Sequence, residues 1–517
     1  MDINLENNAT LPYALLPNIP IELQHCIFLL LDPLDVVSVG STCKALRDSS
    51  NDRTLWAQIL HQTSLKNRFL LYDDGQSVPI RHLKHAATRP ARMLRRLQHH
   101  KTPVASQESQ SITEGLTPVQ TRMISPNSEH RIRRQSSCLF LIPGGRFLVS
   151  SIGDSLSVWD LDSSSPTIIA SATCRAGFVF LVTPSRDQRS FRISVSSNRF
   201  STTGLPLRCK LTIYTFSPDN PGHLECVETE LEAQRDYDLS VFTLVDDVFV
   251  YLHRGNVHAW NFINNKFSSW SLPPAYVDQQ YPEIFIHETK QLVIIGERYV
   301  LAWDIPAFVG LKEYHSKTAA GHTYHGPMQP TSTTPIDLSL MFSQLGVTPE
   351  PPTILPVFCE TTHDWYNSFS SPTSFDIIWT STDDPHDYFT TIDLKNRNHK
   401  KDCSAGLGPT FKLLKLGTAT DDSRCLDSWR LCDDSLVKGC YRGDQYAFEV
   451  IVAPQDNQSE ESEEHKIFFA RLGVFNTGLR RADDFDRFWF SFDPGSGRVC
   501  YLSEIEQKIV VVDYVGM

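Results

Sequence analysis

The chain has 517 residues, which is too long for one ordinary hydrophobic core and predicts two or three domains. Hydrophobic residues make up 41% of the sequence and charged residues 21%, as in ordinary soluble globular proteins. The net charge of −12 argues against a general nucleic-acid binder, because such a protein needs a cationic surface to displace counterions.

The charge is distributed unevenly along the chain. Counting charged side chains gives about −4 for residues 1–63, about +8 for 64–135 and about −16 for 136–517, which indicates separate modules. The acidic start does not resemble a signal peptide, and no apolar run is long enough to span a membrane. The twelve cysteines include no Cys-x-x-Cys motif. We therefore expect reduced thiols, no metal site, no membrane association, and a cytoplasmic or nuclear location.

Residues 16–62, which follow a tail at 1–15 that we expect to be flexible, have the pattern of four short helices. An apolar stripe at helical spacing runs through the first helix: Ile19, Leu23, Ile27, Leu30 and Leu31. Asp32-Pro33 then restarts the chain with a capping residue and a proline, and Leu55 and Trp56 belong to the last helix. So short a unit cannot bury all these apolar side chains by itself, so we expect a partner to complete one face.

A basic connector follows at residues 63–100. Its cations are interleaved with apolar residues: Arg81, Lys84, Arg89, Arg92, Arg95 and Arg96, with Lys101 just beyond. Pro90 is expected to divide it into two helices, the second amphipathic from Ala91 to about His99. The segment could bind an acidic partner or nucleic acid, or act as a rigid spacer with a solvated charged face. We favour the spacer, because the whole-chain charge and the absence of interleaved aromatic residues do not suit nucleic acid.

Residues 101–136, rich in Ser, Thr, Gln and Pro, predict a flexible linker, and residues 137–517 predict an all-β domain. A three-strand pattern ending in an aromatic residue or Val followed by Asp or Asn recurs in four segments: 139–161, 241–262, 284–305 and 490–514. The spacing of Trp260 and Trp303 gives a period of about 43 residues, which is typical of a β-propeller.

We predict about seven blades, with weaker ones beginning near residues 178, 354 and 429. The Trp-Asp ends resemble the WD-repeat pattern, although the Gly-His dipeptide of a full repeat is missing. A pair of β-sandwiches is the alternative. An insertion at 310–356 and an acidic loop at 455–464 are expected to interrupt the domain.

The segment 16–62 resembles the F-box family. The resemblance rests on a spaced set of positions: Leu16-Pro17, Ile19, Leu30-Leu31, Asp32-Pro33-Leu34-Asp35, Cys43-Lys44 and Leu55-Trp56. The chain departs from the family at Val36 to Gly40, where a leucine- and alanine-rich helix is more usual. The resemblance implies an apolar surface that docks a Skp-type adaptor, formed by Leu16, Pro17, Ile19, Leu31, Pro33, Leu34 and Val37. We expect Trp56 to anchor the helical core and not to touch the partner.

The family resemblance implies a substrate-recognition subunit of an SCF-type ubiquitin ligase, linked through the adaptor to a cullin-RING core. The propeller would bind a target protein of unknown identity. Such a subunit acts by proximity, so we expect no catalytic residue and no cofactor. Enzyme motifs are absent from the sequence, and His322 and His325 have no third metal ligand nearby. The alternatives are a scaffold without a ligase role and, less favoured, a propeller enzyme acting on carbohydrate, which would need carboxylates converging in its central channel.

Overall fold

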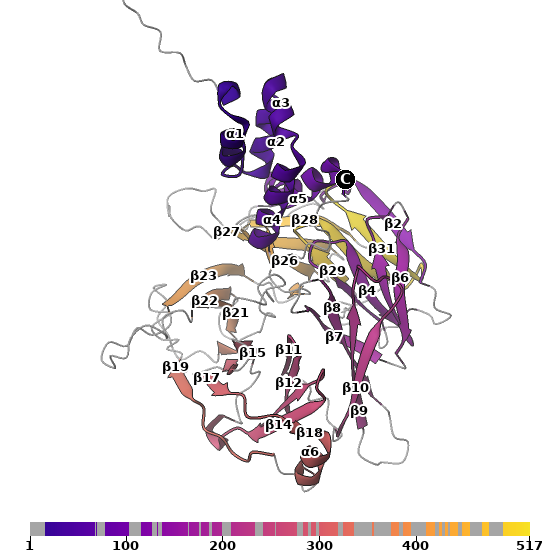
Figure 1. The fold of residues 1–517 in the computed structure, drawn as a ribbon, viewed down its shortest axis with the longest axis vertical. Helices are drawn as coiled ribbons and strands as arrows, with labels where there is room; N and C mark the ends of the chain where they lie inside the picture. Colours follow the sequence, from indigo (N-terminus) through magenta and orange to yellow (C-terminus); the bar gives the residue numbers. More distant parts are fainter. Residues whose placement is uncertain are drawn as a thin grey trace, which may run out of the picture.

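The computed structural model places a group of helices at one end of a ring of β-sheets (Figure 1). The residues it describes are 16–67, 69, 78–102, 115–126, 132, 137–163, 165–174, 177–185, 189–198, 208–232, 241–253, 255–276, 283–287, 291–295, 299–318, 324–335, 354–355, 374–381, 386–393, 410–418, 423–425, 430–432, 435–442, 447–454, 468–474 and 490–516. The predicted tail at 1–15 and acidic loop at 455–464 lie outside these residues.

The N-terminal part is helical, with four helices where the sequence predicts four. The elements are η1 (Leu16–Asn18), α1 (Ile21–Phe28), α2 (Pro33–Gly40), α3 (Lys44–Ser50) and α4 (Arg53–Asn67), followed by the longer α5 (Ile80–His99). Pro33 occupies the first turn of α2, where its missing N–H costs no hydrogen bond. The Asp52 carboxylate accepts a hydrogen bond from the backbone N–H of Leu55 at 2.9 Å and so caps the start of α4.

The helices share a small core of their own. Its buried members are Phe28, Val36, Leu46, Leu55, Trp56, Ile59, Leu60, Phe69, Leu83 and Ala87. Trp56 has no exposed surface, and its indole N–H donates to the Ser50 carbonyl at 2.6 Å. A buried Trp needs such a partner for its only polar atom. The expectation that Trp56 anchors the helical core is confirmed.

Helix α5 is continuous through Pro90, so the prediction of two helices divided at this residue is wrong. A proline inside a helix typically costs about 3 kcal/mol through the lost hydrogen bond and a clash. Here both halves of α5 are held by packing. Leu83 and Ala87 belong to the helical core, and Met93 and Leu97 belong to a core of the β-sheets. Burial on both sides of Pro90 therefore outweighs its helix-breaking tendency.

The strands of the described residues form seven antiparallel sheets. The first two are β3 (Ser137–Leu141), β4 (Phe147–Ile152), β5 (Ser155–Asp160), β6 (Thr167–Thr173), and β7 (Gly177–Pro184), β8 (Phe191–Asn198), β9 (Arg208–Phe216), β10 (Glu225–Glu232). The third is β11 (Val241–Val245), β12 (Val248–His253), β13 (Asn256–Asn261), β14 (Lys266–Ser271), β18 (Val309–Gly310), and the fourth is β15 (Glu283–His287), β16 (Gln291–Ile295), β17 (Tyr299–Asp304), β19 (Ser332–Pro335). The fifth is β20 (Ile354–Leu355), β21 (Ser374–Ser381), β22 (His386–Asp393), β23 (Thr410–Thr418). The sixth is β24 (Ser423–Cys425), β25 (Arg430–Cys432), β26 (Ser435–Arg442), β27 (Ala447–Pro454), β28 (Phe468–Val474), β1 (Lys101–Thr102), and the seventh is β29 (Phe490–Asp493), β30 (Arg498–Ser503), β31 (Lys508–Asp513), β2 (Gln120–Ile124).

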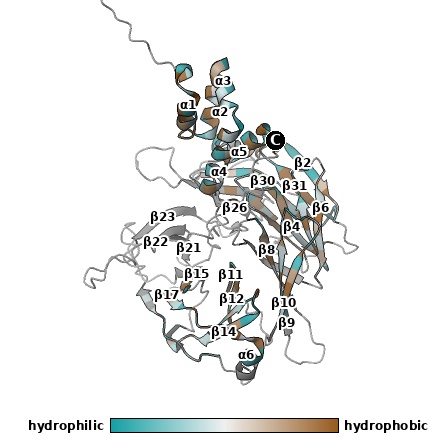
Figure 2. Ribbon diagram, in the orientation of Figure 1, coloured by the Kyte–Doolittle hydropathy of each residue, from teal (hydrophilic) through white to brown (hydrophobic). Residues whose placement is uncertain are grey.

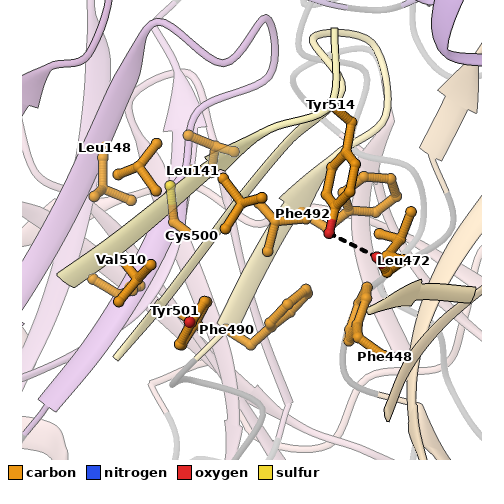
Figure 3. Packing of buried hydrophobic residues seen from close by; sticks show 14 of the residues in the cluster. Leu141, Leu148, Phe448, Leu472, Phe490, Phe492, Cys500, Tyr501, Val510 and Tyr514 are labelled. Carbon is orange, nitrogen blue, oxygen red and sulfur yellow. Dashed lines mark hydrogen bonds between the residues drawn. The ribbon is translucent and has the colours of Figure 1, made fainter. Parts of the chain in front are cut away.

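These sheets are the blades of a β-propeller. The first strands of consecutive sheets contact each other in the series β29, β3, β7, β11 and β15, so they line the inside of the ring. The prediction of a propeller with about seven blades is confirmed, and the β-sandwich alternative is wrong. Figure 3 shows how neighbouring blades pack at the junction of the sixth, seventh and first sheets. Phe448 stacks on Phe490 with ring centroids 3.9 Å apart, and the Tyr514 hydroxyl donates to the Leu472 carbonyl at 3.0 Å.

The prediction of a flexible linker at 101–136 is wrong for two stretches. β1 pairs with β28 as the outer strand of the sixth blade, and β2 pairs with β31 as the outer strand of the seventh, in register from Gln120 opposite Asp513 to Ile124 opposite Ile509. The sequence of β2 is Gln-Thr-Arg-Met-Ile, which lacks the alternation of apolar and polar residues that predicts a strand. In the structure only Ile124 of this strand is buried. Its pairing covers the apolar edge of β31 and closes the ring with a segment that precedes the propeller in sequence.

The predicted insertion at 310–356 lies partly outside the described residues and is in part structural. It supplies α6 (Leu311–Thr318), whose Tyr314 packs on Phe267 of β14 with ring centroids 5.0 Å apart. It also supplies β19 and β20, which belong to the fourth and fifth blades. A short η4 (Pro274–Tyr276) precedes β15. The expectation that the whole segment only interrupts the domain is wrong for these elements.

Candidate partner-binding surface

Helix α1 turns an apolar stripe toward solvent. Its buried residues are Gln24 and Phe28, one turn apart. On the other side Leu23 is 54% exposed and Ile27 37%, and Leu30, just beyond the helix end, is 87% exposed. Residues spaced i, i+4 and i+7 follow one face of a helix. In most surface helices that apolar face is the one that packs on the core, so its exposure here marks a surface open to a partner.

Hydrogen bonds fix this orientation of α1. The Gln24 side-chain amide donates to the Ile19 carbonyl at 2.9 Å, and His25 Nε2 lies 3.1 Å from the Ser49 carbonyl of α3. Phe28 is fully buried in the helical core. Rotating the helix to bury Leu23 and Leu30 would expose Phe28 and break both bonds, so the exposed stripe is built into the fold.

Helix α2 extends the apolar surface. Val36 is fully buried, and the adjacent Val37 is 42% exposed. Pro33 and Leu34 in the first turn are half-buried. Backbone fixed by Pro33 keeps this turn pre-organised, which lowers the entropy lost when a partner covers it. Figure 2 shows hydrophobic positions of α1 on helices that stand clear of the β-sheets.

The seven residues predicted to dock the adaptor divide into two groups. Val37 is exposed, and six are half-buried: Leu16, Pro17, Ile19, Leu31, Pro33 and Leu34. Leu16 and Leu31 also pack against the helical core. Their role in partner binding stays a prediction. All seven keep some accessible surface at the part of the chain that stands away from the propeller.

Sequence reasoning missed the most exposed part of this surface. Leu23 and Leu30 expose more of their side chains than any of the seven predicted residues does, and Ile21, 48% exposed, lies on another side of α1. The sequence does show the apolar stripe at helical spacing. Periodicity alone does not say whether the stripe packs on the helical core or faces solvent. Glu22, Asp32 and Asp35 are exposed around it and give the apolar surface an acidic rim.

An ion cluster attaches the helices to the propeller. The buried Arg498 of β30 contacts Asp513 at 2.5 Å and Asp162 at 3.1 Å, and Arg89 of α5 lies 3.9 Å from Asp162. Burial raises the pKa of Asp162, but Arg89 and Arg498 outweigh this effect and hold that pKa below its ordinary value. A charged pair is retained in so buried a place only when it is well bonded. The helices therefore share one interface with the first blade, which supplies Asp162, and the seventh, which supplies Arg498 and Asp513.

Backbone contacts reinforce the same interface. Arg92 donates to the Gly516 carbonyl at 3.3 Å, and Arg96 donates to the Thr117 carbonyl at 2.8 Å and to that of Tyr514. The expectation of a fully solvated charged face is wrong for these two arginines and for Arg89, because α5 lies against the end of the last blade and its basic side chains reach that blade.

Within the described segments, no group of three or more His, Cys, Asp or Glu side chains gathers in a way that could hold a metal ion. His325, one of the two histidines considered as ligands, lies 3.2 Å from the Ala307 carbonyl, and His322 is outside these segments. None of the helices described has both the length and the apolar character needed to cross a bilayer.

The exposed apolar surface and the ring of sheets define the class of this protein, a small helical module fixed to a β-propeller. Residues 16–62 match the family model described as F-box-like. The chain therefore carries an F-box-like domain followed by a β-propeller of seven sheets. A search of curated proteins found no match.

The solved structures that resemble the chain include the following three, one of which is described as a WD40 domain. The C-terminal WD40 domain of Sif2 is 11% identical, with a TM-score of 0.35 over 78% of this chain and 99% of that one. The N-terminal domain of Nup159 is 12% identical, with a TM-score of 0.35 over 78% and 96%. Raptor from Chaetomium thermophilum is 9% identical, with a TM-score of 0.37 over 97% of this chain and 40% of that one. Scores this low support no functional conclusion, and the propeller assignment depends on the seven sheets.

Proposed function

We propose that the chain is the substrate-recognition subunit of an SCF-type ubiquitin ligase and is not itself an enzyme. The observation that carries the proposal is the outward stripe of α1, with Leu30 87% exposed, inside an F-box-like domain. A Skp-type adaptor would cover this stripe and Val37 and would link the chain to a cullin-RING core. The free energy of binding would come from burying apolar surface, and the pre-organised backbone would limit the entropy lost.

The attachment of the helices leaves one end of the propeller for a target protein. Phe69 of the helical core lies beside Gly144, in the β3–β4 turn, and Gly495, in the β29–β30 turn. The turns at the other end of the same blades include residues 153–154 and 504–507, where Ile505 is 62% exposed. Loops at this end would hold the target at a set distance from the ligase core, so that proximity raises the effective concentration of its lysines.

The test is co-purification with a recombinant Skp-type adaptor. Leu23→Asp and Leu30→Asp place a charge in the proposed interface, and each should weaken adaptor binding by about 30-fold or more, as expected for a hot-spot residue. The matched control is Leu65→Asp on α4, a leucine 43% exposed in the same module, which should bind as the wild type does. Unchanged binding by the α1 variants, with an unaltered circular-dichroism spectrum, would contradict the proposal.

A second measurement separates a ligase subunit from a scaffold. The purified complex should also retain a cullin-RING core and should support ubiquitin transfer to proteins that bind the propeller. A complex that contains the adaptor but neither recruits the cullin nor modifies any bound protein would favour the scaffold alternative.

A further inference from the structure

Helix α5 carries cations along one side and no acidic residue anywhere in its sequence. At 100° per residue, five of them fall within an arc of about 120° whose centre points away from Leu83, Leu94 and Leu97, and the buried Thr88 lies within the same arc. We name this face the basic ridge, and its members are Arg81, Lys84, Arg92, Arg95 and Arg96.

The basic ridge is not neutralised by the protein itself. In the part of the chain that the structure describes, the only α5 cation within 4.0 Å of a carboxylate is Arg89, which lies outside the ridge. Arg81 and Arg95 are exposed and have no hydrogen-bond partner among these residues. Lys84 donates to the Asn51 side-chain oxygen and lies 5.2 Å from the centre of the Trp56 ring, so its partners are neutral.

The remaining two arginines lie at the joint between α5 and the last blade, where neither meets a carboxylate among the described residues. Arg92 and Arg96 donate to backbone carbonyls, which orients both guanidinium groups without adding a negative charge. Burial and the neighbouring Arg96 lower the pKa of Arg92, and burial and Arg92 lower the pKa of His85. Mutual repulsion of this kind is relieved when an anion binds.

We propose that the basic ridge is a second docking surface, which binds an acidic polypeptide segment of a partner protein. From residue 81 to residue 96 the helix rises about 22 Å, a length that about seven residues of extended peptide can follow. Acidic side chains spaced along such a peptide can meet the ridge cations in turn. This inference does not depend on the ligase role, because the ridge is separate from the α1 stripe.

An acidic peptide suits the ridge better than nucleic acid does. No aromatic side chain other than histidine lies on α5, so bases would have no stacking platform. The chain as a whole carries −12, which repels a polyanion at long range more strongly than a short peptide. Charge complementarity over a single helix face therefore favours a short acidic segment.

The test uses the full chain and a fluorescein-labelled peptide of ten glutamates, with binding followed by fluorescence anisotropy at low salt. The double variant Arg81→Glu/Arg95→Glu should weaken binding by about tenfold or more. The matched control, Lys266→Glu/Lys312→Glu, reverses two exposed lysines on β14 and α6 and changes the net charge equally. The control should stay within about twofold of the wild type.

Four results would overturn the proposal. The first is no binding of the peptide by the wild type, and the second is an equal loss of binding in both double variants. The third is tighter binding of a labelled DNA duplex than of the peptide, and the fourth is much tighter peptide binding after neutral replacement of the four glutamates at 460, 461, 463 and 464. The second result would reduce the effect to net charge, and the third would make the ridge a nucleic-acid site. The fourth would identify the chain's own acidic segment as the occupant. Circular dichroism of each variant checks that loss of binding is not loss of folding.

Discussion

Gly40 ends α2 where this helix passes closest to α3. A Cβ at this position would lie 2.3 Å from Ser50 Oγ, too close for the side chains to remain as they are. We expect Gly40→Ala to destabilise the helical module by about 1–3 kcal/mol, the usual effect of forcing an extra methyl group into a packed site. Urea unfolding followed by helical circular dichroism measures this change.

The control for Gly40→Ala removes Ser50 Oγ, the atom that the new Cβ would meet. Ser50→Ala leaves a contact of 3.3 Å from the Ser50 Cβ, so the double variant Gly40→Ala/Ser50→Ala should recover most of the lost stability. Ser50→Ala alone should change stability little, because the Oγ bonds only the local Arg47 carbonyl at 3.1 Å. A double variant no more stable than Gly40→Ala would show that the contact is not the cause.

Substitution of Asp513 tests how much the ion cluster next to α5 contributes to stability. Burial lowers the pKa of Arg498, but Asp513 and Asp162 outweigh it and leave that pKa above its ordinary value, so Arg498 stays charged. Asp513→Asn removes the main counter-charge of Arg498, and we expect the free energy of unfolding to fall by about 3–5 kcal/mol, as for other broken buried ion pairs. Asp304→Asn is the control, at the exposed end of β17. Equal unfolding midpoints in guanidinium chloride for both variants would contradict the role of Asp513.

His258 gives a pH dependence with a definite sign. Burial and then His253 lower its pKa to about 3, and its Nδ1 lies 2.9 Å from the Tyr314 hydroxyl of α6. Because the folded pKa is below the unfolded value of about 6.5, its contribution to stability is present above pH 6.5 and is lost as pH falls toward 3. The wild type should therefore lose more stability between pH 7.5 and 5 than His258→Gln does. Parallel urea midpoints for the two proteins would contradict this.

Residue roles could be predicted where chemistry limits the choices. Trp56 was predictable as a core anchor, because a large, mostly apolar ring at the end of a small helical bundle is most favourably placed in the core of that bundle. The side on which Leu23 and Leu30 lie was not, because periodicity defines a stripe without saying what covers it. In the sequence, Gly40 stands out only as part of the departure from the family pattern at Val36 to Gly40. Its cause is a contact with Ser50, which no local sequence pattern contains.

At the scale of elements, β2 is the strand whose removal should matter most. It covers β31, in which Ile509, Val510, Val511 and Val512 are all buried. A fragment of residues 137–517 leaves this apolar strand as an open edge, and we expect it to aggregate. A fragment of residues 78–517 keeps α5, β1 and β2 and should be soluble. Size-exclusion chromatography of the two fragments is the measurement, and a monomeric 137–517 fragment would contradict the closing role of β2.

Elements that depend on distant partners were the ones that sequence patterns misjudged. β2 has little alternation of its own and becomes a strand only by pairing with a segment almost four hundred positions later. α5 stays helical through Pro90 because packing on two cores overrides a local preference. In contrast, the blades beginning at β3, β11, β15 and β29 repeat an internal pattern, and each was predictable from the sequence.

At the scale of the whole molecule, the recurring three-strand pattern with its period of about 43 residues was enough to predict the propeller. The joint between the two modules could not be predicted from the sequence. That joint consists of side chains from both ends of the chain, such as Met93 of α5, which lies beside Gly497 of the seventh blade. Contacts of this range leave no trace in local composition. They nevertheless decide whether the helical module and the propeller move as one body.

The shared position of α5 predicts that the two modules unfold together. Met93 and Leu97 are fully buried in the propeller-side core, so Met93→Ala and Leu97→Ala should each cost about 2–5 kcal/mol. Because Leu83 and Ala87 of the same helix belong to the helical core, each substitution should lower the helical and the β-sheet transitions by the same amount. Far-ultraviolet circular dichroism and tryptophan fluorescence report the two transitions, with Leu65→Ala as an exposed control. A helical transition unmoved by Met93→Ala would mean that the modules are independent bodies. In that case α5 could not hold a bound target at a set distance from a partner on α1.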